Sequence, residues 1–215
     1  MKGKLFLPVF LFLLFFIHHG NSQILKGYGL KIGLTIANQD FDYTNHLLRL
    51  DSKYRAGINA GFFMNLLEMN FIELAPEINY TQKGMKHEVP FTTPQDPGGE
   101  AGESRTNYVR LDYLNFRISG KFKYPLPAVT PFFLLGPRVE YKINDKMDAG
   151  YRIIYDKYDD ILYGLSAGFG IAISSLVSTP LIAEFIYNYD FNTPYQTDNL
   201  AVRNIDFEMR LGIQF

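Results

Sequence analysis

The sequence contains no cysteine, and this absence excludes several kinds of protein. Disulfide frameworks, thiol nucleophiles and thiolate metal sites all require cysteine. Histidine is also scarce, with four residues in 215, and only His46 and His87 lie beyond the amino-terminal segment. These two histidines are not enough to form a metal site. We therefore predict no bound metal and no cofactor.

The amino-terminal segment has the parts of a secretory signal peptide. Two lysines precede an apolar run, and small residues stand at the minus-three and minus-one positions before Gln23. The run is about 13 residues long, whereas a membrane-spanning helix needs about 20. We predict that residues 1–22 are cleaved and that residues 23–215 form one exported domain. The residues of the signal are Lys2, Lys4, the run 5–17, Gly20 and Ser22.

An excess of basic residues is also absent. Without Lys2 and Lys4, 21 − 2 = 19 basic residues stand against 22 acidic ones, for a net charge of −3 over 193 residues. This balance argues against a nucleic-acid partner, which would need a clustered basic face. No later stretch has 18 consecutive apolar residues. Membrane helices are therefore excluded, but the alternating strands of a membrane barrel are not, and they fit the mean hydropathy of −0.07.

The last twelve residues, 204–215, show the clearest pattern in the chain. Apolar residues from Ile205 to Phe215 alternate strictly with polar residues or glycine. Only a β-strand turns a two-residue period into one apolar and one polar face. A strand that runs to the final residue and ends in an aromatic favours a transmembrane barrel strand over a frayed strand of a soluble sandwich.

The same alternation recurs along the chain and predicts eight strands. The connections alternate in length: those at 66–69, 125–130 and 174–180 are short, and those at 39–53, 84–111, 144–160 and 192–202 are long. This is the pattern of an all-β, antiparallel, up-and-down transmembrane barrel with periplasmic turns and extracellular loops. The alternative is a soluble lipocalin-like barrel, in which the apolar face of each strand would point into the barrel and the polar face would point outward. The expected strands are 27–38, 54–65, 70–83, 112–124, 131–143, 161–173, 181–191 and 204–215.

Aromatic residues on the outward parity are expected to form two girdles at the membrane interfaces. Two outward prolines, Pro76 and Pro137, would each remove a ladder hydrogen bond, so we expect a bulge at each. The long-loop girdle is predicted to contain Tyr54, Tyr80, Tyr141, Tyr163 and Tyr187, and the opposite girdle Tyr28, Phe62, Tyr124 and Phe215.

Charged residues on the inward parity form the candidate site. The interior of an eight-stranded barrel is just wide enough for its side chains, so these charges should pair with one another. A structural salt-bridge network is the simpler interpretation, and a gated proton or small-ion path is the alternative. The predicted lumen network comprises Lys31, Arg55, Glu73, Glu77, Arg117, Arg138, Glu140, Glu184, Glu208 and Arg210.

Other chemistry has weaker support in the sequence. His46, near Asp42 and Asp51, could meet a serine such as Ser52 in a lipid-modifying hydrolase or transferase, but a loop histidine is more often simply solvated. The cluster Asp156, Asp159 and Asp160 matches no calcium-loop spacing.

The loop at 84–111 is rich in proline and glycine. It is either the best surface for a protein partner or a plain solvated connection, because such composition cannot build a packed core.

Two stretches resemble a known family. Residues 76–84, Pro-Glu-Ile-Asn-Tyr-Thr-Gln-Lys-Gly, are similar to the end of the third strand in PorT-like outer-membrane barrels of the Bacteroidota. Residues 132–141, with Gly136-Pro137, are similar to the fifth strand of that family. The fourth strand departs from the family, because Tyr113-Leu-Asn-Phe-Arg117 lacks its usual proline.

The resemblance implies an outer-membrane location in contact with lipid. It also raises a role associated with type IX secretion as an expectation. We therefore expect a non-enzymatic barrel of the OmpA-like size class. Its protein partners would bind extracellular loops or periplasmic turns.

Overall fold

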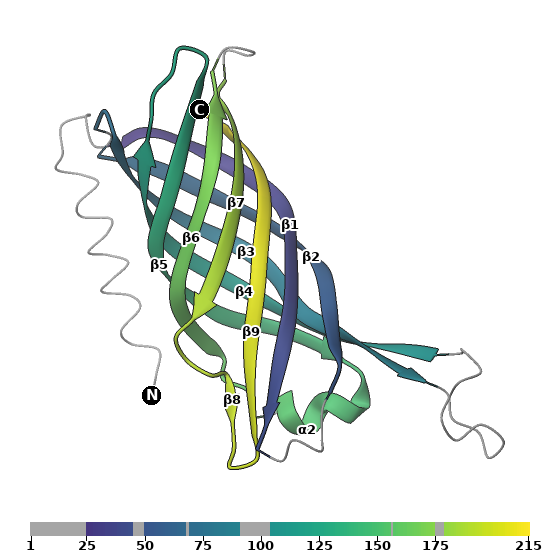
Figure 1. Ribbon diagram of the computed structural model, residues 1–215. Coiled ribbons are helices and arrows are strands. Elements are labelled where there is room, and N and C mark those ends of the chain that lie inside the picture. Colours follow the sequence, from purple (N-terminus) through teal and green to yellow (C-terminus); the bar gives the residue numbers. More distant parts are fainter. Residues whose placement is uncertain (1–24, 45–49, 68, 91–103, 156, 175–178) are drawn as a thin grey trace, which may run out of the picture.

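The computed structural model describes residues 25–44, 50–67, 69–90, 104–155, 157–174 and 179–215. The expected signal peptide, residues 1–22, lies outside these ranges. Within them the chain forms one antiparallel sheet of neighbouring strands that closes on itself (Figure 1). Among the described residues, no helix is long and apolar enough to cross a membrane.

Eight long strands make the ring; each pairs with the next long strand in sequence, and the last pairs with the first. A ninth strand, the two-residue β8 (Tyr195–Gln196), pairs only with β9. A short helical segment, η1 (Ala149–Tyr151) followed by α2 (Arg152–Tyr155), lies between β5 and β6. The ring strands are β1 (Leu25–Tyr43), β2 (Ser52–Leu66), β3 (Ile72–Pro90), β4 (Ser104–Lys123), β5 (Val129–Met147), β6 (Ile161–Ile173), β7 (Leu181–Asp190) and β9 (Leu200–Gln214).

The first and last strands close the ring. β1 and β9 pair continuously from Gly29 opposite Gln214 to Tyr43 opposite Leu200. At the terminal end, the Tyr28 amide donates to the Phe215 carbonyl at 3.1 Å and the Phe215 amide donates to the Tyr28 carbonyl at 2.7 Å. The alternation at the carboxy terminus therefore supplies the strand that removes the edge of the sheet.

Six of the eight ring strands extend further toward the long loops than the sequence predicted, whereas β6 begins at the predicted residue and β7 ends one residue earlier than predicted. β3 continues to Pro90 and β4 begins at Ser104, so most of the expected loop 84–111 is a paired hairpin that projects from the barrel (Figure 1). β1 likewise continues to Tyr43 and β5 to Met147. The prediction ended these strands where the apolar alternation ended, but backbone pairing continues into the polar sequence beyond it.

The expected bulges at the two prolines were wrong. Pro76 lies opposite Ile118 and Pro137 opposite Leu165 in uninterrupted register. The register shifts of the described sheet occur elsewhere: between Leu25 and Gly27, between Tyr54 and Asn59, and between Asp112 and Tyr113. Toward the other neighbouring strand, each proline lies in a gap of the ladder: no pairs form between Phe63–Glu77 and Leu66–Leu74 in β2–β3. The same holds between Arg117–Arg138 and Gly120–Leu135 in β4–β5. The missing proline N–H is thus accommodated by a local loss of pairing without a shift of register.

The outer surface of the ring is apolar. Ile32 and Leu211, which are opposite one another in the β1–β9 ladder, are 68% and 66% exposed. A continuous exposed apolar surface of this kind requires a nonaqueous neighbour. Eight of the nine expected girdle residues are exposed, whereas Tyr80 is half-buried beneath the Arg110 side chain, which donates to its hydroxyl at 3.2 Å.

Candidate functional site: the barrel interior

The interior face of the ring carries charged and amide side chains that are almost completely shielded from solvent. They point inward because the side chains of a strand alternate between its two faces, and apolar residues occupy the other face. Burying a charge is costly unless it is paired. The chemical properties of the interior therefore depend on which of these charges pair with one another.

Four residues form the centre of the network. Lys31 Nζ lies 2.5 Å from Glu77 Oε1 and 2.9 Å from Glu184 Oε1. Arg210 bridges the same two carboxylates, at 2.9 Å from Glu77 Oε2 and 2.6 Å from Glu184 Oε2. Each carboxylate is thus shared by two cations that come from different strands.

Arg117 extends this centre toward the long-loop end. Its Nη2 donates to Glu208 at 3.0 Å and to the Asn188 amide oxygen at 3.2 Å. Asn188 in turn donates to Glu208 at 2.9 Å and to Asp206 at 2.6 Å. Asn188 therefore connects the central pairs to the next layer.

The next layer is built on Lys83 and Arg138. Lys83 Nζ lies 2.7 Å from both Glu140 and Asp206. Arg138 Nη1 lies 2.7 Å from Glu140, and its Nη2 pairs with Asp190. At the short-turn end, Glu73 pairs with Lys121 at 3.2 Å and Lys123 at 3.1 Å.

The network is electrically balanced. Among the described residues it contains seven cations and seven carboxylates, so the formal charges cancel. Sequence reasoning had included nine of these fourteen in its lumen set. The other five, Lys83, Lys121, Lys123, Asp190 and Asp206, share the inward parity, and that parity was the signal that could have found them. The cations are Lys31, Lys83, Arg117, Lys121, Lys123, Arg138 and Arg210, and the carboxylates are Glu73, Glu77, Glu140, Glu184, Asp190, Asp206 and Glu208.

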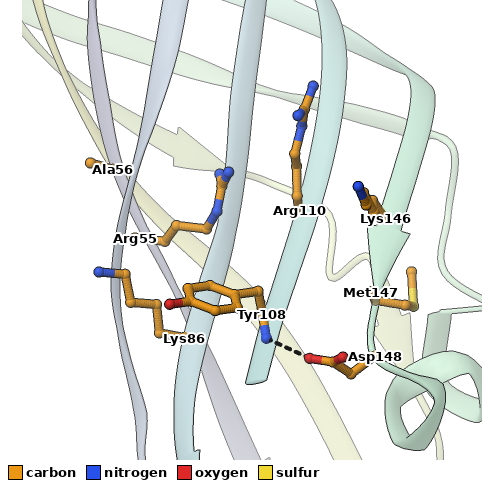
Figure 2. A pocket seen from close by; sticks show the side chains of 8 residues that line it. All are labelled: Arg55, Ala56, Lys86, Tyr108, Arg110, Lys146, Met147 and Asp148. Carbon is orange, nitrogen blue, oxygen red and sulfur yellow. Dashed lines mark hydrogen bonds between the residues drawn. The ribbon is translucent and has the colours of Figure 1, made fainter. Parts of the chain in front are cut away.

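Arg55 is the member of the expected set that the structure places elsewhere. Its Nη1 donates to the Lys83 backbone carbonyl at 3.4 Å, and its side chain lines an open pocket on the outside of the barrel (Figure 2). The register shift between Tyr54 and Asn59 is the physical reason, because a shift breaks the simple alternation of faces.

The two stretches that resemble PorT-like proteins contribute to this interior. Glu77 and Lys83 belong to the first stretch and Arg138 to the second, and all three are in the network. Gly84, which ends the first stretch, has φ of 130°, and a Cβ there would lie 2.0 Å from the Val109 carbonyl oxygen. These residue types are therefore explained by the construction of the barrel.

Apolar clusters lie on both sides of the charged layers. Toward the short turns, Phe63 packs with Phe132, Leu134, Ile182 and Ile186, and Lys31 Nζ lies 4.4 Å from the Phe63 ring centre. Toward the long loops, inward residues of the strand extensions pack with tyrosines that follow β5. We call this second cluster the tyrosine cap; its buried members are Phe41, Met85, Val109, Leu111, Tyr113, Tyr151, Tyr155, Tyr158, Leu162 and Val202.

The cap is held by hydrogen bonds as well as by packing. Tyr158 donates to the Asn204 amide oxygen at 2.9 Å and accepts from Gln39 at 3.0 Å, and Tyr155 donates to Gln39. The rings of Tyr155 and Tyr158 stack with centres 5.1 Å apart. Burial raises the pKa of both phenols well above the usual value, because a phenolate would lose its hydration there.

The residues considered for catalysis and calcium binding do not assemble in the described part of the chain. His46 and Asp156 lie outside the described residues. The Ser52 hydroxyl donates to the Gln39 carbonyl at 2.5 Å, and His87 Nδ1 lies 2.6 Å from the Tyr151 hydroxyl. Asp160 pairs with Lys142 at 3.0 Å. Within the described ranges, no three histidine or acidic side chains are arranged to hold a metal ion.

A closed ring of eight antiparallel strands with an apolar outside and a charged inside is a transmembrane β-barrel, because a closed ring has no unpaired sheet edge to expose to lipid. The chain belongs to the outer membrane protein beta-barrel domain family, whose pattern matches residues 21–194. It is therefore a protein of the bacterial outer membrane. A search of curated proteins finds no match.

Similar solved structures are small outer-membrane barrels. OprG of Pseudomonas aeruginosa aligns with a TM-score of 0.49 and 10% identity over 90% of this chain and 97% of its own. Neisserial surface protein A aligns with a TM-score of 0.42 and 13% identity over 88% and 100%. Ail of Yersinia pestis aligns with a TM-score of 0.39 and 12% identity over 88% and 98%.

Proposed function

We propose that this protein is a non-enzymatic, non-conducting outer-membrane barrel that acts through its surface. The observation that carries the proposal is the balanced interior network, in which each cation is held by at least one carboxylate from another strand. Lys31, for example, contacts Glu77 and Glu184 at 2.5 and 2.9 Å. An ion that crossed the barrel would have to separate pairs that have little access to water, at a cost of several kcal/mol for each charge left alone.

The apolar clusters strengthen this proposal. The tyrosine cap and the Phe63 cluster place uncharged, closely packed side chains before and after the charged layers. A permeating ion would lose its hydration twice in addition to breaking the ion pairs. The gated channel is therefore the weaker alternative, since no single side-chain movement would open all three layers.

Conductance measurements test this proposal directly. The mature protein, folded and inserted in planar lipid bilayers, is expected to pass no steady current at moderate voltage. A double variant, Tyr155→Ala and Tyr158→Ala, is also expected to stay closed because the ion-pair layers remain. Regular single-channel steps from the natural protein would contradict the proposal, and steps from the cap variant alone would show that the cap is a gate.

The enzyme alternative is less well supported. A lipid hydrolase or transferase needs a nucleophile within hydrogen-bond reach of a base, and the Ser52 hydroxyl is instead occupied by the Gln39 carbonyl. Incubation of the folded protein with outer-membrane lipids should leave acyl chains and headgroups unchanged by mass spectrometry. A lipid product that disappears in a His46→Ala, His87→Ala variant would overturn the non-enzymatic assignment.

A role associated with type IX secretion is a narrower hypothesis that rests on the PorT-like resemblance. The residues that carry the resemblance, such as Glu77 and Lys83, lie inside the barrel and cannot contact a partner. Any secretion partner would have to bind the loops or turns instead. Deletion of the gene and comparison of secreted proteins with a complemented strain would test the role, and an unchanged set would exclude it.

A further inference from the structure

A cluster of positive charge lies on the outside of the barrel, away from the interior network. Arg55, Lys86, Arg110 and Lys146, from β2, β3, β4 and β5 in that order, line an open pocket of about 480 Å³ (Figure 2). Tyr108 and Asp148 also line it. We call this site the cationic pocket.

Strand register brings these residues together on the outward face. Val109 and Leu111 are fully buried in the tyrosine cap, so the alternating residues Tyr108 and Arg110 face outward. Lys86 lies opposite Tyr108, and Lys146 lies opposite Arg110. The cationic pocket is thus built on paired backbone rather than on a loop.

The positive charge of the pocket is not balanced. Arg110 is paired, with Nε and Nη2 each 2.8 Å from an oxygen of Asp112. Asp148 accepts from the Tyr108 amide at 2.9 Å and pairs with Arg105 at 3.7 Å. In the described ranges, Arg55, Lys86 and Lys146 have no carboxylate within ion-pair distance. Three of the four cations that line the pocket are therefore without an ion-pair partner among the described residues, which contrasts with the balance of the interior.

The pocket lies at the depth of lipid headgroups. The Arg110 guanidinium contacts the hydroxyl of Tyr80 at 3.2 Å. Tyr80 lies in a row with Leu114 and Tyr141 on the outer surface, and interfacial tyrosines mark the headgroup level. Figure 2 shows the Arg55 and Arg110 guanidinium groups pointing the same way along the strands, away from the end of β4 where Tyr108 lies. The charges are therefore next to the membrane surface on the long-loop side.

We propose that the cationic pocket binds a phosphate group of a lipid headgroup in the outer leaflet. Guanidinium and ammonium groups are the side chains that bind phosphate in proteins, and basic pockets at the membrane surface bind anionic headgroups. The lipid is favoured over a soluble anion because Arg110, which lines the pocket, contacts Tyr80 of the tyrosine row on the outer surface. The bound headgroup would supply the negative charge that Arg55, Lys86 and Lys146 lack.

Lipid binding to the folded mature protein in detergent tests the proposal. The probes are lipid A, the same lipid after enzymatic removal of its phosphates, and inorganic phosphate, each measured by native mass spectrometry or calorimetry. The test variant is Arg55→Gln, Lys86→Gln, Lys146→Gln, which leaves the Arg110 pair intact. The control variant, Arg152→Gln, Lys157→Gln, Arg203→Gln, removes the same charge from exposed residues at the same end of the barrel.

The natural protein should bind lipid A at least about tenfold more tightly than the dephosphorylated lipid, and the test variant should lose that preference. The control variant should keep it. Equal binding of the two lipids, an unchanged test variant, or an equal loss in the control would overturn the proposal. Inorganic phosphate that binds as tightly as lipid A would also overturn it, because the site would then serve a soluble anion.

Heat-modifiable mobility of each variant shows whether it has folded. If the test variant does not fold, the single change Lys146→Gln on an exposed side chain replaces it, with an expected loss of about threefold in lipid A binding. No loss in a folded Lys146→Gln protein would count against the proposal.

Discussion

Arg210 lies directly opposite Glu184 in the β7–β9 ladder, and its Nη2 donates to Glu184 Oε2 at 2.6 Å. Cross-strand register therefore makes this ion pair, and Lys31 of the adjoining β1 completes it from the other side. Both partners are buried. These buried ion pairs therefore contribute both to the stability of the barrel and to the charge balance of its interior.

Removing one partner of this pair should be costly. Glu184→Leu leaves Lys31 and Arg210 with one shared carboxylate fewer, and we expect a loss of about 3 to 5 kcal/mol in the free energy of unfolding. Urea unfolding in lipid vesicles, followed by heat-modifiable mobility, measures it. The matched control is Glu88→Gln in the exposed Lys53–Glu88 pair, which should change little. Similar effects from the two changes would show that the interior is hydrated.

The apolar outer surface predicts that an added charge is tolerated at one exposed position and not at another. Ile32→Arg places a charge on the apolar outer face of β1, and we expect it to cost about 2 to 4 kcal/mol near the bilayer centre. Gln196→Arg, on the exposed β8 near the long loops, should have little effect on stability. The comparison uses unfolding in vesicles. Equal tolerance of both changes would contradict the position of the membrane around β1.

Two glycines predict opposite outcomes for the same substitution. A Cβ at Gly33 would lie 2.0 Å from the Met209 carbonyl oxygen, whereas one at Gly120 would approach nothing closer than the Leu135 carbonyl oxygen at 3.7 Å. Gly33→Ala should therefore destabilise the barrel by roughly 1 to 3 kcal/mol through overpacking. Gly120→Ala should be neutral or slightly stabilising, because alanine restricts the unfolded chain. Refolding yields and urea midpoints of the two variants would check this order.

The tyrosine cap predicts a loss of stability in alkali. The pKa values of Tyr155 and Tyr158 are raised by burial, so above about pH 10 these phenols would ionise when the cap is open but not while it is closed. The open form then binds fewer protons than the closed form, and the stability of the cap falls as pH rises. Below pH 10 the effect should be absent.

Phenolate absorbance and protease cleavage after β5, measured against pH, follow this opening. A Tyr155→Phe, Tyr158→Phe variant should show a smaller alkaline transition, and burial of Tyr151, whose pKa is also raised, should account for the part that remains. The variant should be more open at neutral pH because Gln39 and Asn204 lose their phenol partners. A cap that opens at the same alkaline pH in both proteins would show that other groups control it.

Local pattern predicted much of the barrel because a strand side chain has only two directions available. The alternation from Ile205 to Phe215 identified the closing strand, and parity alone placed Lys31, Glu184 and Arg210 on the inner face. The same rule misplaced Arg55. A register shift is decided by the neighbouring strand, so sequence alternation within β2 could not reveal it.

The amino-acid sequence by itself determined the number of long strands, their order and the face on which most side chains lie, since each follows from a period of two and from the lengths of the connections. Only the tertiary structure decided which charges meet. Lys83 pairs with Asp206 across 123 positions of sequence because closure of the ring brings β3 and β9 to opposite sides of one narrow interior. The grouping of Arg55 with Lys86, Arg110 and Lys146 likewise depends on register between four strands, which no single strand encodes.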